Sequence, residues 1–236
     1  MKLHIIVHES FEAPAALADW AASRHHDIEY TRLYLNQSLP EDVDAFDFLV
    51  VMGGPQSPAT TPAECAYFAA GKEIALIRKA VARGKLVLGI CLGAQLLGEA
   101  FGAGFAPSPN REIGVFALSL TESGRKDPVF STFPEQFMVG HWHGDMPGLT
   151  AAAEVLACSA GCPRQVIRYT PRVYGFQCHF EFTPAAIEVM IEHCAAELEK
   201  YKSLPYVQDA SALRNSRYEE MNAYLFRFLD YLESLQ

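Results

Sequence analysis

Short apolar runs alternate with helix-like patterns over the first hundred residues. Residues 3–7, 46–52 and 85–90 are mostly apolar and have the length of single strands, and residues 28–32 form another extended segment. Strands that are buried on both faces are typical of a parallel sheet covered by helices on both sides. The pattern therefore predicts an α/β fold with an open, mostly parallel sheet flanked by helices on both faces.

Three helices are expected between these strands, at 14–23, 61–84 and 92–101. The second has the clearest start, because residues 61–64 have the sequence Thr-Pro-Ala-Glu. In that order the threonine can cap the helix, the proline takes its first position, and the glutamate reaches back as in a capping box. Gly84 is a typical C-terminal stop. We therefore expect this helix to begin at the threonine.

The second half of the chain has a different pattern, of short β-like segments separated by turns. These segments lie near 113–120, 136–141, 154–158, 165–169 and 173–178. Their length and spacing are typical of strands joined by turns. We therefore expect them to add β structure to the fold predicted for the first half.

The C-terminal part is predicted to be mainly helical. One helix is expected from Thr183 to about Lys200, followed by a less patterned connector over 204–215 and a final helix over about 216–235. Docking of the final helix onto its own domain is the favoured interpretation, and a homodimer or a partner contact is the alternative. Its apolar residues recur at three- and four-residue steps and form one stripe: Tyr218, Met221, Leu225, Phe228, Leu232 and Leu235.

Composition and charge exclude several classes of protein. Half of the 236 residues are hydrophobic, and 19 Lys and Arg against 28 Asp and Glu leave a net charge of −9. This acidic balance argues against a nucleic-acid partner, which requires clustered basic residues. No run approaches the ~18–20 apolar residues of a membrane span, and the N-terminal run is too short for a signal peptide. Six cysteines without a secretory signal favour reduced thiols, so we expect a soluble, cytoplasmic protein.

The strongest chemical signal is the sequence Gly-Ile-Cys-Leu-Gly-Ala-Gln at residues 89–95, which crosses from a predicted strand into a predicted helix. Glycines two residues either side of Cys91 leave room for a tight turn, as in a nucleophile elbow. Such a turn raises the thiol above the edge of the sheet and points it at the amino end of the helix, where the helix dipole favours a thiolate. Taken alone, the motif is equally compatible with a buried structural cysteine.

A glycine loop follows the preceding predicted strand. Gly53-Gly54-Pro55 lies at the same edge of a parallel sheet as Cys91, where ligands bind in such folds. Two glycines leave backbone N–H groups unshielded, so the N–H groups of Gly54 and Leu92 are candidate donors to a developing oxyanion. An ordinary Gly-Pro turn is the alternative interpretation.

A histidine and a carboxylate stand at the end of the last predicted strand, in the sequence Gly-Phe-Gln-Cys-His-Phe-Glu at 175–181. His179 and Glu181 are two residues apart in an extended segment, so their side chains project to the same side. That arrangement allows the carboxylate to orient the imidazole while the other ring nitrogen faces a nucleophile. On its own, His-x-Glu is also typical of a solvated strand end.

Together these motifs resemble the class I, or triad-type, glutamine amidotransferase domain, and the resemblance covers nearly all of residues 1–198. The elbow, the Gly53-Gly54 loop and the His179-Phe180-Glu181 segment each match a motif of that family. Met52 and Phe180 stand where the family usually has proline. The donor glycines and the functional side chains are retained.

Two further segments are similar to stretches of the GMP-synthase-like branch of this family. They are Arg111-Glu112-Ile113-Gly114 and His141-Trp142-His143-Gly144-Asp145. The resemblance implies a flavodoxin-like fold for residues 1–198, with residues 199–236 as a C-terminal helical extension packed on it. It also implies a stand-alone member of the branch.

A role for each motif residue follows from the resemblance. Cys91 would be the nucleophile, His179 the general acid and base, and Glu181 the carboxylate that orients it. The oxyanion donors would be the N–H groups of Gly54 and Leu92. The residues implied in substrate binding are Gly53, Gln95 and Asp145, the last at the α-amino group.

The implied activity is hydrolysis of the side-chain amide of glutamine through a γ-glutamyl thioester, with ammonia passed to a synthetase on a separate chain. The sequence contains neither a Walker-type nor a pyrophosphatase-type ATP loop. Two alternatives stay open. One is a γ-glutamyl peptidase acting on glutathione-type substrates with the same triad, and the other is a non-catalytic regulatory subunit on the same fold. No cofactor is expected.

The His141-Trp142-His143-Gly144-Asp145 segment also allows a metal interpretation, since His-x-His-x-Asp occurs in binuclear metallohydrolases. Met146 follows where another histidine would be needed, so the signature is incomplete and no catalytic metal is expected. Cys158 and Cys162 have a loose zinc spacing without a second pair, and are expected to be ordinary thiols.

Overall fold

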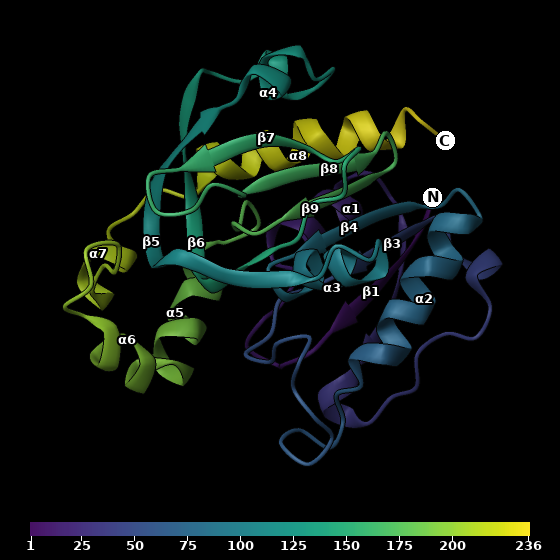
Figure 1. Cartoon of the computed structure of the whole chain (residues 1–236), viewed down its shortest axis with the longest axis horizontal. Helices are drawn as coiled ribbons and strands as arrows, with labels where there is room; N and C mark the ends of the chain where they lie inside the picture. The colour runs from purple at the N-terminus through teal and green to yellow at the C-terminus, as the bar shows by residue number, and fades with distance from the viewer.

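One nine-stranded sheet organises the chain, and the computed structural model describes all 236 residues (Figure 1). The strands are β1 (Lys2–Val7), β2 (Asp27–Arg32), β3 (Phe48–Val51), β4 (Leu86–Ile90), β5 (Phe105–Leu120), β6 (Gln136–Pro147), β7 (Glu154–Ser159), β8 (Val166–Thr170) and β9 (Val173–Phe176). They lie side by side in the order β2-β1-β3-β4-β9-β8-β7-β5-β6.

The two halves of the sheet differ in strand direction. β2, β1, β3, β4 and β9 pair in parallel, whereas β9, β8, β7, β5 and β6 pair antiparallel. Parallel neighbours need long crossover connections, and the helices between the first strands supply them, whereas antiparallel neighbours can be joined by turns. The predicted fold class, an open α/β sheet with added β segments in the second half, is confirmed.

Eight α-helices accompany the sheet. They are α1 (Ala16–Ser23), α2 (Ala70–Ala82), α3 (Leu92–Ala100), α4 (Glu122–Lys126), α5 (Pro184–His193), α6 (Ala195–Tyr201), α7 (Ala210–Arg214) and α8 (Glu219–Glu233). None of them combines the length and the apolar character needed to cross a bilayer.

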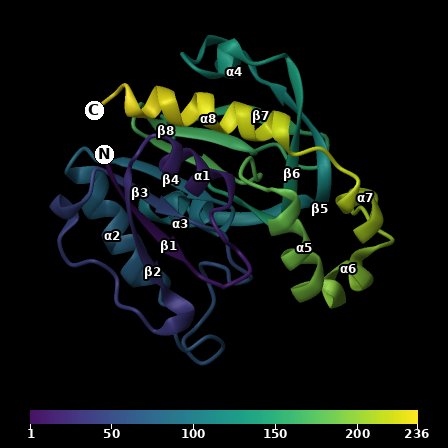
Figure 2. The ribbon, with the colours of Figure 1, turned by 180° about the vertical axis from the view of Figure 1, so that it is seen from behind.

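The helices of the parallel half form a layer on each face of the sheet. α1 and α8 lie on one face, as the view from behind shows (Figure 2), and α2 and α3 lie on the other. Successive residues of a strand point to opposite faces. On β1, Leu3 and Ile5 accordingly pack with α1 and α8, whereas Ile6 packs with α2 and α3. The inner strands β3 and β4 are apolar throughout because both faces are covered, whereas the edge strand β2 keeps polar residues.

The final helix lies along the sheet with its apolar stripe inward. Leu225, Phe228 and Leu232 are buried in the same cluster as the apolar face of α1. Beside this contact, Trp20 Nε1 of α1 donates a hydrogen bond to Asp230 Oδ1 of α8 at 2.8 Å. The two helices therefore form one layer that covers the sheet.

The predicted helix start at Thr61 is wrong, because α2 begins at Ala70. The capping contact itself forms, since Thr61 N donates to Glu64 Oε2 at 2.8 Å, but it closes only a single turn. A helix over 61–84 would be ~36 Å long, whereas the neighbouring strands β3 and β4 have four and five residues. Phe68 is buried in the core under α2, which draws the segment before Ala70 along the core surface.

The helix predicted from Thr183 is divided at Cys194 into α5 and α6. Its start is confirmed: the Thr183 hydroxyl oxygen accepts a backbone N–H of the first turn, and Pro184 occupies that turn. The connector predicted over 204–215 contains the short helix α7, and the final helix agrees with α8 to within three residues at its start.

Two strands are longer than the sequence pattern predicted. β5 begins at Phe105 and β6 ends at Pro147, so they form a long antiparallel ribbon with a register shift between Pro107 and Glu112. The added segments contain proline, glycine and charged residues, which conceal a strand pattern. The ribbon carries the His-Trp-His-Gly-Asp segment to the edge of the parallel half.

Candidate active site

Cys91 lies at the junction of β4 and α3, at the carboxyl ends of the parallel strands. Its backbone has φ 51° and ψ −106°, and such a conformation costs ~1–3 kcal/mol for a residue with a side chain. A Cβ at Gly89 would overlap the backbone of Gly93, and a Cβ at Gly93 would overlap the carbonyl of Val51. The structure therefore forms the tight turn predicted from the sequence, and only glycine fits beside it.

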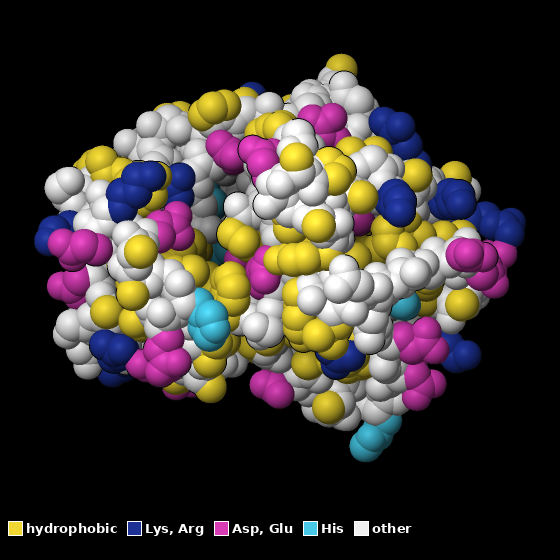
Figure 3. All heavy atoms as spheres, turned by 90° about the horizontal axis from the view of Figure 1, so that it is seen from below, with side chains coloured by type: hydrophobic (Ala, Val, Ile, Leu, Met, Phe, Trp, Pro, Cys, Tyr) yellow, Lys and Arg dark blue, Asp and Glu magenta, His cyan; other side chains and the backbone are white.

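Cys91 is only 7% exposed, and it lines a cavity of about 270 Å³. The surface is hollowed on this side of the molecule, between the lobe made by α5, α6 and α7 and the main body (Figure 3). Gln177 Nε2 donates to the sulfur at 3.4 Å, and the thiol donates to the Trp142 carbonyl at 3.6 Å. The thiol is thus held by neutral groups at the floor of a cavity that a small substrate can enter.

His179 and Glu181 follow β9 in an irregular segment, past the end of the strand where they were predicted. His179 Nδ1 and Glu181 Oε1 are 2.6 Å apart, and the imidazole stacks on the Phe182 ring with centroids 4.2 Å apart. The backbone of His179 is tied to Gly140 of β6 by two hydrogen bonds. His179 Nε2 has no hydrogen-bond partner in the chain, so this nitrogen is available to a reacting group.

The charges of the site act on one another at short range. Burial raises the pKa of the Cys91 thiol, against the opposing effect of His179. Burial alone would lower the pKa of His179, but the carboxylate of Glu181 and the neighbouring thiol outweigh it and hold that pKa well above its usual value. The imidazole is therefore held as a proton donor beside the sulfur.

The Gly53-Gly54 loop is fixed from below by a buried pair. His8 Nδ1 lies 2.9 Å from the Gly53 carbonyl oxygen, and His8 Nε2 lies 2.9 Å from Glu73 Oε2. Burial would lower the pKa of His8, but Glu73 and the Gly53 carbonyl raise it above its usual value. Both ring nitrogens of the resulting imidazolium donate, one to the loop and one to the carboxylate.

The remaining predicted site residues lie around the same cavity. Gly54, Gln95 and Asp145 line it, together with Cys91. Gln95 Nε2 donates to Gln177 Oε1 at 3.2 Å, while the Gln95 carbonyl oxygen has no partner. Gly53 and Leu92 are buried directly behind the lining, and His179 and Glu181 line a smaller adjoining cavity.

Several residues of the site were not singled out from the sequence. Glu12 lines both cavities, and Arg111 and Glu197 face the larger one, where Arg111 Nη1 and Glu197 Oε1 form an ion pair at 2.6 Å. Glu12 and His8 follow the first strand, so the rule that places ligands at this sheet edge could have found them. Glu197 belongs to α6, and no motif in the sequence indicated that it would reach the site.

The segment with the histidine and glutamate is also held from the C-terminal helix. Asn222 Nδ2 of α8 donates to the carbonyl oxygens of Phe180 and Phe182, at 2.8 and 2.9 Å. From the other side, Ala16 N at the start of α1 donates to the Glu181 carbonyl at 3.1 Å. Three successive carbonyls around Glu181 therefore have fixed directions.

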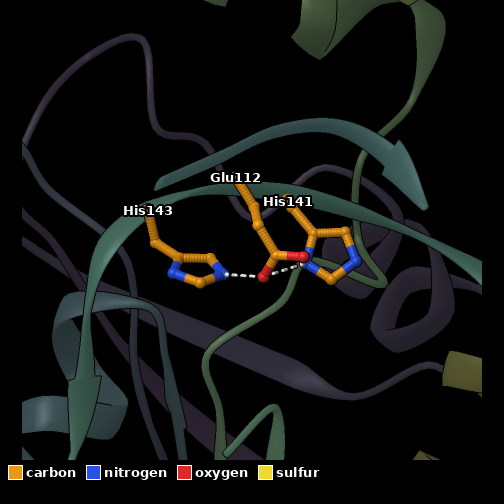
Figure 4. A group of neighbouring side chains, drawn as sticks. All are labelled: Glu112, His141 and His143. Carbon is orange, nitrogen blue, oxygen red and sulfur yellow. Dashed lines mark ion pairs between the residues drawn. The ribbon is translucent and has the colours of Figure 1, made fainter. Parts of the chain in front are cut away.

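A second buried group lies behind the cavity, where Glu112 stands between His141 and His143 (Figure 4). The three ligand-type atoms lie within 4.8 Å of one another, and both ring nitrogens of His141 have no hydrogen-bond partner. Burial lowers the pKa of His141 to about 3, so its ring is neutral. Asp145, which completed the metal motif in the sequence, lies instead at the main cavity.

Hydrogen bonds within the chain already occupy the centre of this group. Gln165 Nε2 donates to Glu112 Oε2 at 2.6 Å and lies 3.2 Å from His143 Nε2, and the Ser159 hydroxyl donates to Glu112 at 2.8 Å. A cation between the carboxylate and the imidazole would have to displace the Gln165 amide. The donor set suits Zn²⁺, but the Glu112 carboxylate already accepts hydrogen bonds from Gln165 and Ser159, while His141 has no hydrogen-bond partner.

Comparison with known proteins gives the family of this fold and site. Residues 17–197 match the family described as glutamine amidotransferase class-I. Over 232 residues the chain is 48% identical to YfeJ, a glutamine amidotransferase-like protein of Salmonella typhimurium, and the match covers 98% of this chain and 97% of YfeJ. The chain therefore belongs to the class-I glutamine amidotransferase family.

Two further similarities locate the chain within the family. It is 39% identical over 97 residues to a glutamine-hydrolysing GMP synthase of Syntrophomonas wolfei, a match that covers 40% of this chain and 18% of the synthase. The crystal structure of SMU.1228c superposes with a TM-score of 0.96 at 48% identity, over 99% of this chain and 100% of that one. The resemblance inferred from the sequence motifs is confirmed.

Proposed function

We propose that this protein hydrolyses the side-chain amide of glutamine, with Cys91 as the nucleophile. The observation that carries the proposal is the position of Cys91: a strained turn holds its thiol at the floor of a cavity, next to the His179–Glu181 pair. In the reactive form the proton of the Cys91 thiol resides on His179, and the resulting thiolate attacks the amide carbonyl and forms a tetrahedral oxyanion. His179 then protonates the departing nitrogen, the C–N bond breaks, and a γ-glutamyl thioester remains.

The second half of the cycle returns the enzyme to its starting state. His179, now neutral, removes a proton from a water molecule that attacks the thioester carbonyl. The C–S bond breaks, glutamate leaves, and the imidazole is again a proton donor beside Cys91. Glu181 keeps the Nδ1 proton in place throughout, because its carboxylate lies 2.6 Å from that nitrogen.

Backbone N–H groups of Gly54 and Leu92 would stabilise the oxyanion. Gly54 N and Leu92 N donate no hydrogen bond to another backbone group. In a trans peptide the C=O and N–H point in opposite directions. His8 holds the Gly53 carbonyl from below at 2.9 Å, and this fixes the Gly54 N–H toward the cavity that Gly54 lines. His8 would thus be a positioning residue for the oxyanion site.

The glutamine moiety would bind across the larger cavity. Gln95 offers an unpartnered carbonyl oxygen, and Asp145 offers a carboxylate that makes no hydrogen bond within the chain, which suits the α-ammonium group. Gly53 leaves space beside the thiol. The released ammonia would be used by a synthetase on a separate chain, a proposal supported by the similarity to one part of a GMP synthase.

Labelling and product assays together test this function. A diazo-ketone analogue of glutamine should form a covalent adduct on the wild-type protein, and Cys91→Ser should abolish it. Cys158→Ser is the matched control, because Cys158 lies on β7 and does not line the cavity, so labelling should persist. Ammonia release from glutamine is the expected activity. Turnover of glutathione without turnover of glutamine would favour the peptidase, and absence of both labelling and turnover would leave the regulatory subunit.

A further inference from the structure

Glu12 is a carboxylate of the active-site cavity that has no hydrogen-bond partner in the chain, as is Asp145. Glu12 follows β1, and its side chain makes no hydrogen bond within the chain, whereas the neighbouring Glu9 accepts one from Gln56 Nε2 at 2.7 Å. Burial raises the pKa of Glu12 to about 7. The side chain is half-buried and no donor within the chain reaches its carboxylate, so a ligand in the cavity can supply one.

The position of Glu12 is next to the reacting atoms. A Cβ at Gly53 would overlap Glu12 Oε2 and would lie 3.4 Å from Cys91 Cβ, so the carboxylate and the thiol flank the same glycine. Glu12 also lines both the cavity of Cys91 and the adjoining cavity of His179. The carboxylate therefore lies close to both the nucleophile and the proton donor.

The polarity of the substrate's amide group decides what Glu12 contacts. The amide oxygen becomes an oxyanion and requires donors, which a carboxylate does not supply. The amide nitrogen carries N–H groups that require an acceptor, and it must lie beside His179, from which it receives its proton. We propose that Glu12 is a specificity-determining residue that accepts a hydrogen bond from the leaving nitrogen and forms an anionic subsite for the departing amine.

This inference rests on the proposed function and names the substrate class within it. As the C–N bond breaks, its electron pair goes to nitrogen and the proton comes from His179, so Glu12 only accepts hydrogen bonds and neither gains nor loses a proton. Ammonia and uncharged or cationic primary amines are compatible leaving groups. An amino-acid leaving group places a second carboxylate two bonds from the nitrogen, where it is repelled by Glu12.

Charge balance in the cavity supports this class of substrate. The lining contains Glu12, Asp145 and Glu197 but only Arg111 as a cation, and Arg111 is paired with Glu197. The imidazolium of His179, next to Glu12, becomes neutral when it gives its proton to the leaving nitrogen, so Asp145 and Glu12 are then two carboxylates without a cation. The α-ammonium of a γ-glutamyl compound satisfies one of them, at Asp145, and the leaving amine satisfies the other.

The experiment compares γ-glutamyl substrates that differ only in the tail of the leaving amine. γ-Glutamyl methylamide has a neutral tail, the γ-glutamyl conjugate of ethylenediamine a cationic one, and γ-glutamylglycine an anionic one. The readout is the ratio of their kcat/KM values within one preparation, which cancels any misfolded fraction. We expect the wild type to favour the cationic and neutral tails over the anionic tail by at least about tenfold, as repulsion between nearby carboxylates requires.

Glu12→Gln keeps the shape and an acceptor oxygen but removes the charge. In this variant the preference against γ-glutamylglycine should fall by about tenfold, which corresponds to the loss of about 1.4 kcal/mol of repulsion between two carboxylates. Glu9→Gln is the matched control from the same segment, and its ratio should stay unchanged because Glu9 does not line the cavity.

Each outcome either supports or overturns the subsite. An unchanged ratio in Glu12→Gln, with Cys91 still labelled by the diazo-ketone, overturns the subsite alone. An equal loss on all three substrates would place Glu12 at the common α-ammonium, which also overturns it. Absence of labelling and of turnover in the wild type would overturn the proposed function, and the subsite with it.

Discussion

The buried His8 allows the oxyanion loop to be tested without touching Cys91. Its two ring nitrogens serve different partners, Nδ1 the Gly53 carbonyl and Nε2 the Glu73 carboxylate, each at 2.9 Å. An asparagine amide nitrogen can take the place of Nδ1, and a glutamine amide nitrogen can take the place of Nε2. His8→Asn therefore keeps the bond to the loop, and His8→Gln keeps the bond to Glu73.

The two variants should separate activity from stability. In His8→Gln the Gly53-Gly54 peptide loses its anchor, and loss of one oxyanion donor typically lowers kcat by about 10²–10³. In His8→Asn the buried Glu73 loses its partner, which costs about 1–3 kcal/mol of unfolding free energy, while kcat stays within about tenfold of the wild type. Ammonia release measures kcat, and urea denaturation measures stability.

If His8 anchors the loop, His8→Gln should lose mainly kcat and His8→Asn should lose mainly stability. If His8→Gln kept the wild-type kcat, the Gly54 N–H would not depend on His8, and the positioning role would be refuted. If both variants lost kcat equally and in step with stability, His8 would be a general structural residue only.

Three further predictions concern the rest of the molecule. Phe228→Ala should lower the free energy of unfolding by ~3–5 kcal/mol, because this ring is buried between α8 and the sheet. Phe226 is only partly buried, so Phe226→Ala should show a much smaller loss in the same denaturation experiment. The pKa values of His8 and His179 are raised, so their pairs contribute stability that is full below pH 6.5 and lost as the pH rises through the raised values. Thermal unfolding at increasing pH should show that fall, and a rising midpoint would contradict it. Treatment with EDTA should leave the activity unchanged, because the Gln165 amide already occupies the centre of the Glu112 group. Stoichiometric zinc in the purified protein, measured by elemental analysis, would refute this.

Elements whose formation depends on local pattern were predictable from the sequence. The apolar runs placed the parallel strands, and Thr183-Pro184 marked a helix start that the structure contains. The capping sequence at Thr61 shows the limit of this reasoning, because the local contact forms while the core position of Phe68 decides where the helix begins.

The parts of the candidate site that could be predicted are those in which neighbouring residues of one motif define the local backbone conformation. The glycines beside Cys91 report a turn that no other residue fits, so the elbow could be located from sequence alone. Glu197 could not, since it reaches the cavity from α6 only after residues far apart in the chain have packed together. A charged residue outside any motif, such as Glu12, can be recognised as a site residue only when the structure shows that it lines the cavity without a partner.

The family match ends at residue 197, yet the hydrogen bonds of Asn222 reach back to the carbonyls on either side of Glu181. A fragment that stopped at the end of the match would contain every residue proposed for catalysis. It would also lose the two hydrogen bonds that hold the carbonyls on either side of Glu181, and would uncover the apolar sheet face beneath Phe228. The segment that matches the family is therefore shorter than the segment that the active site needs. The smallest active fragment should include α8.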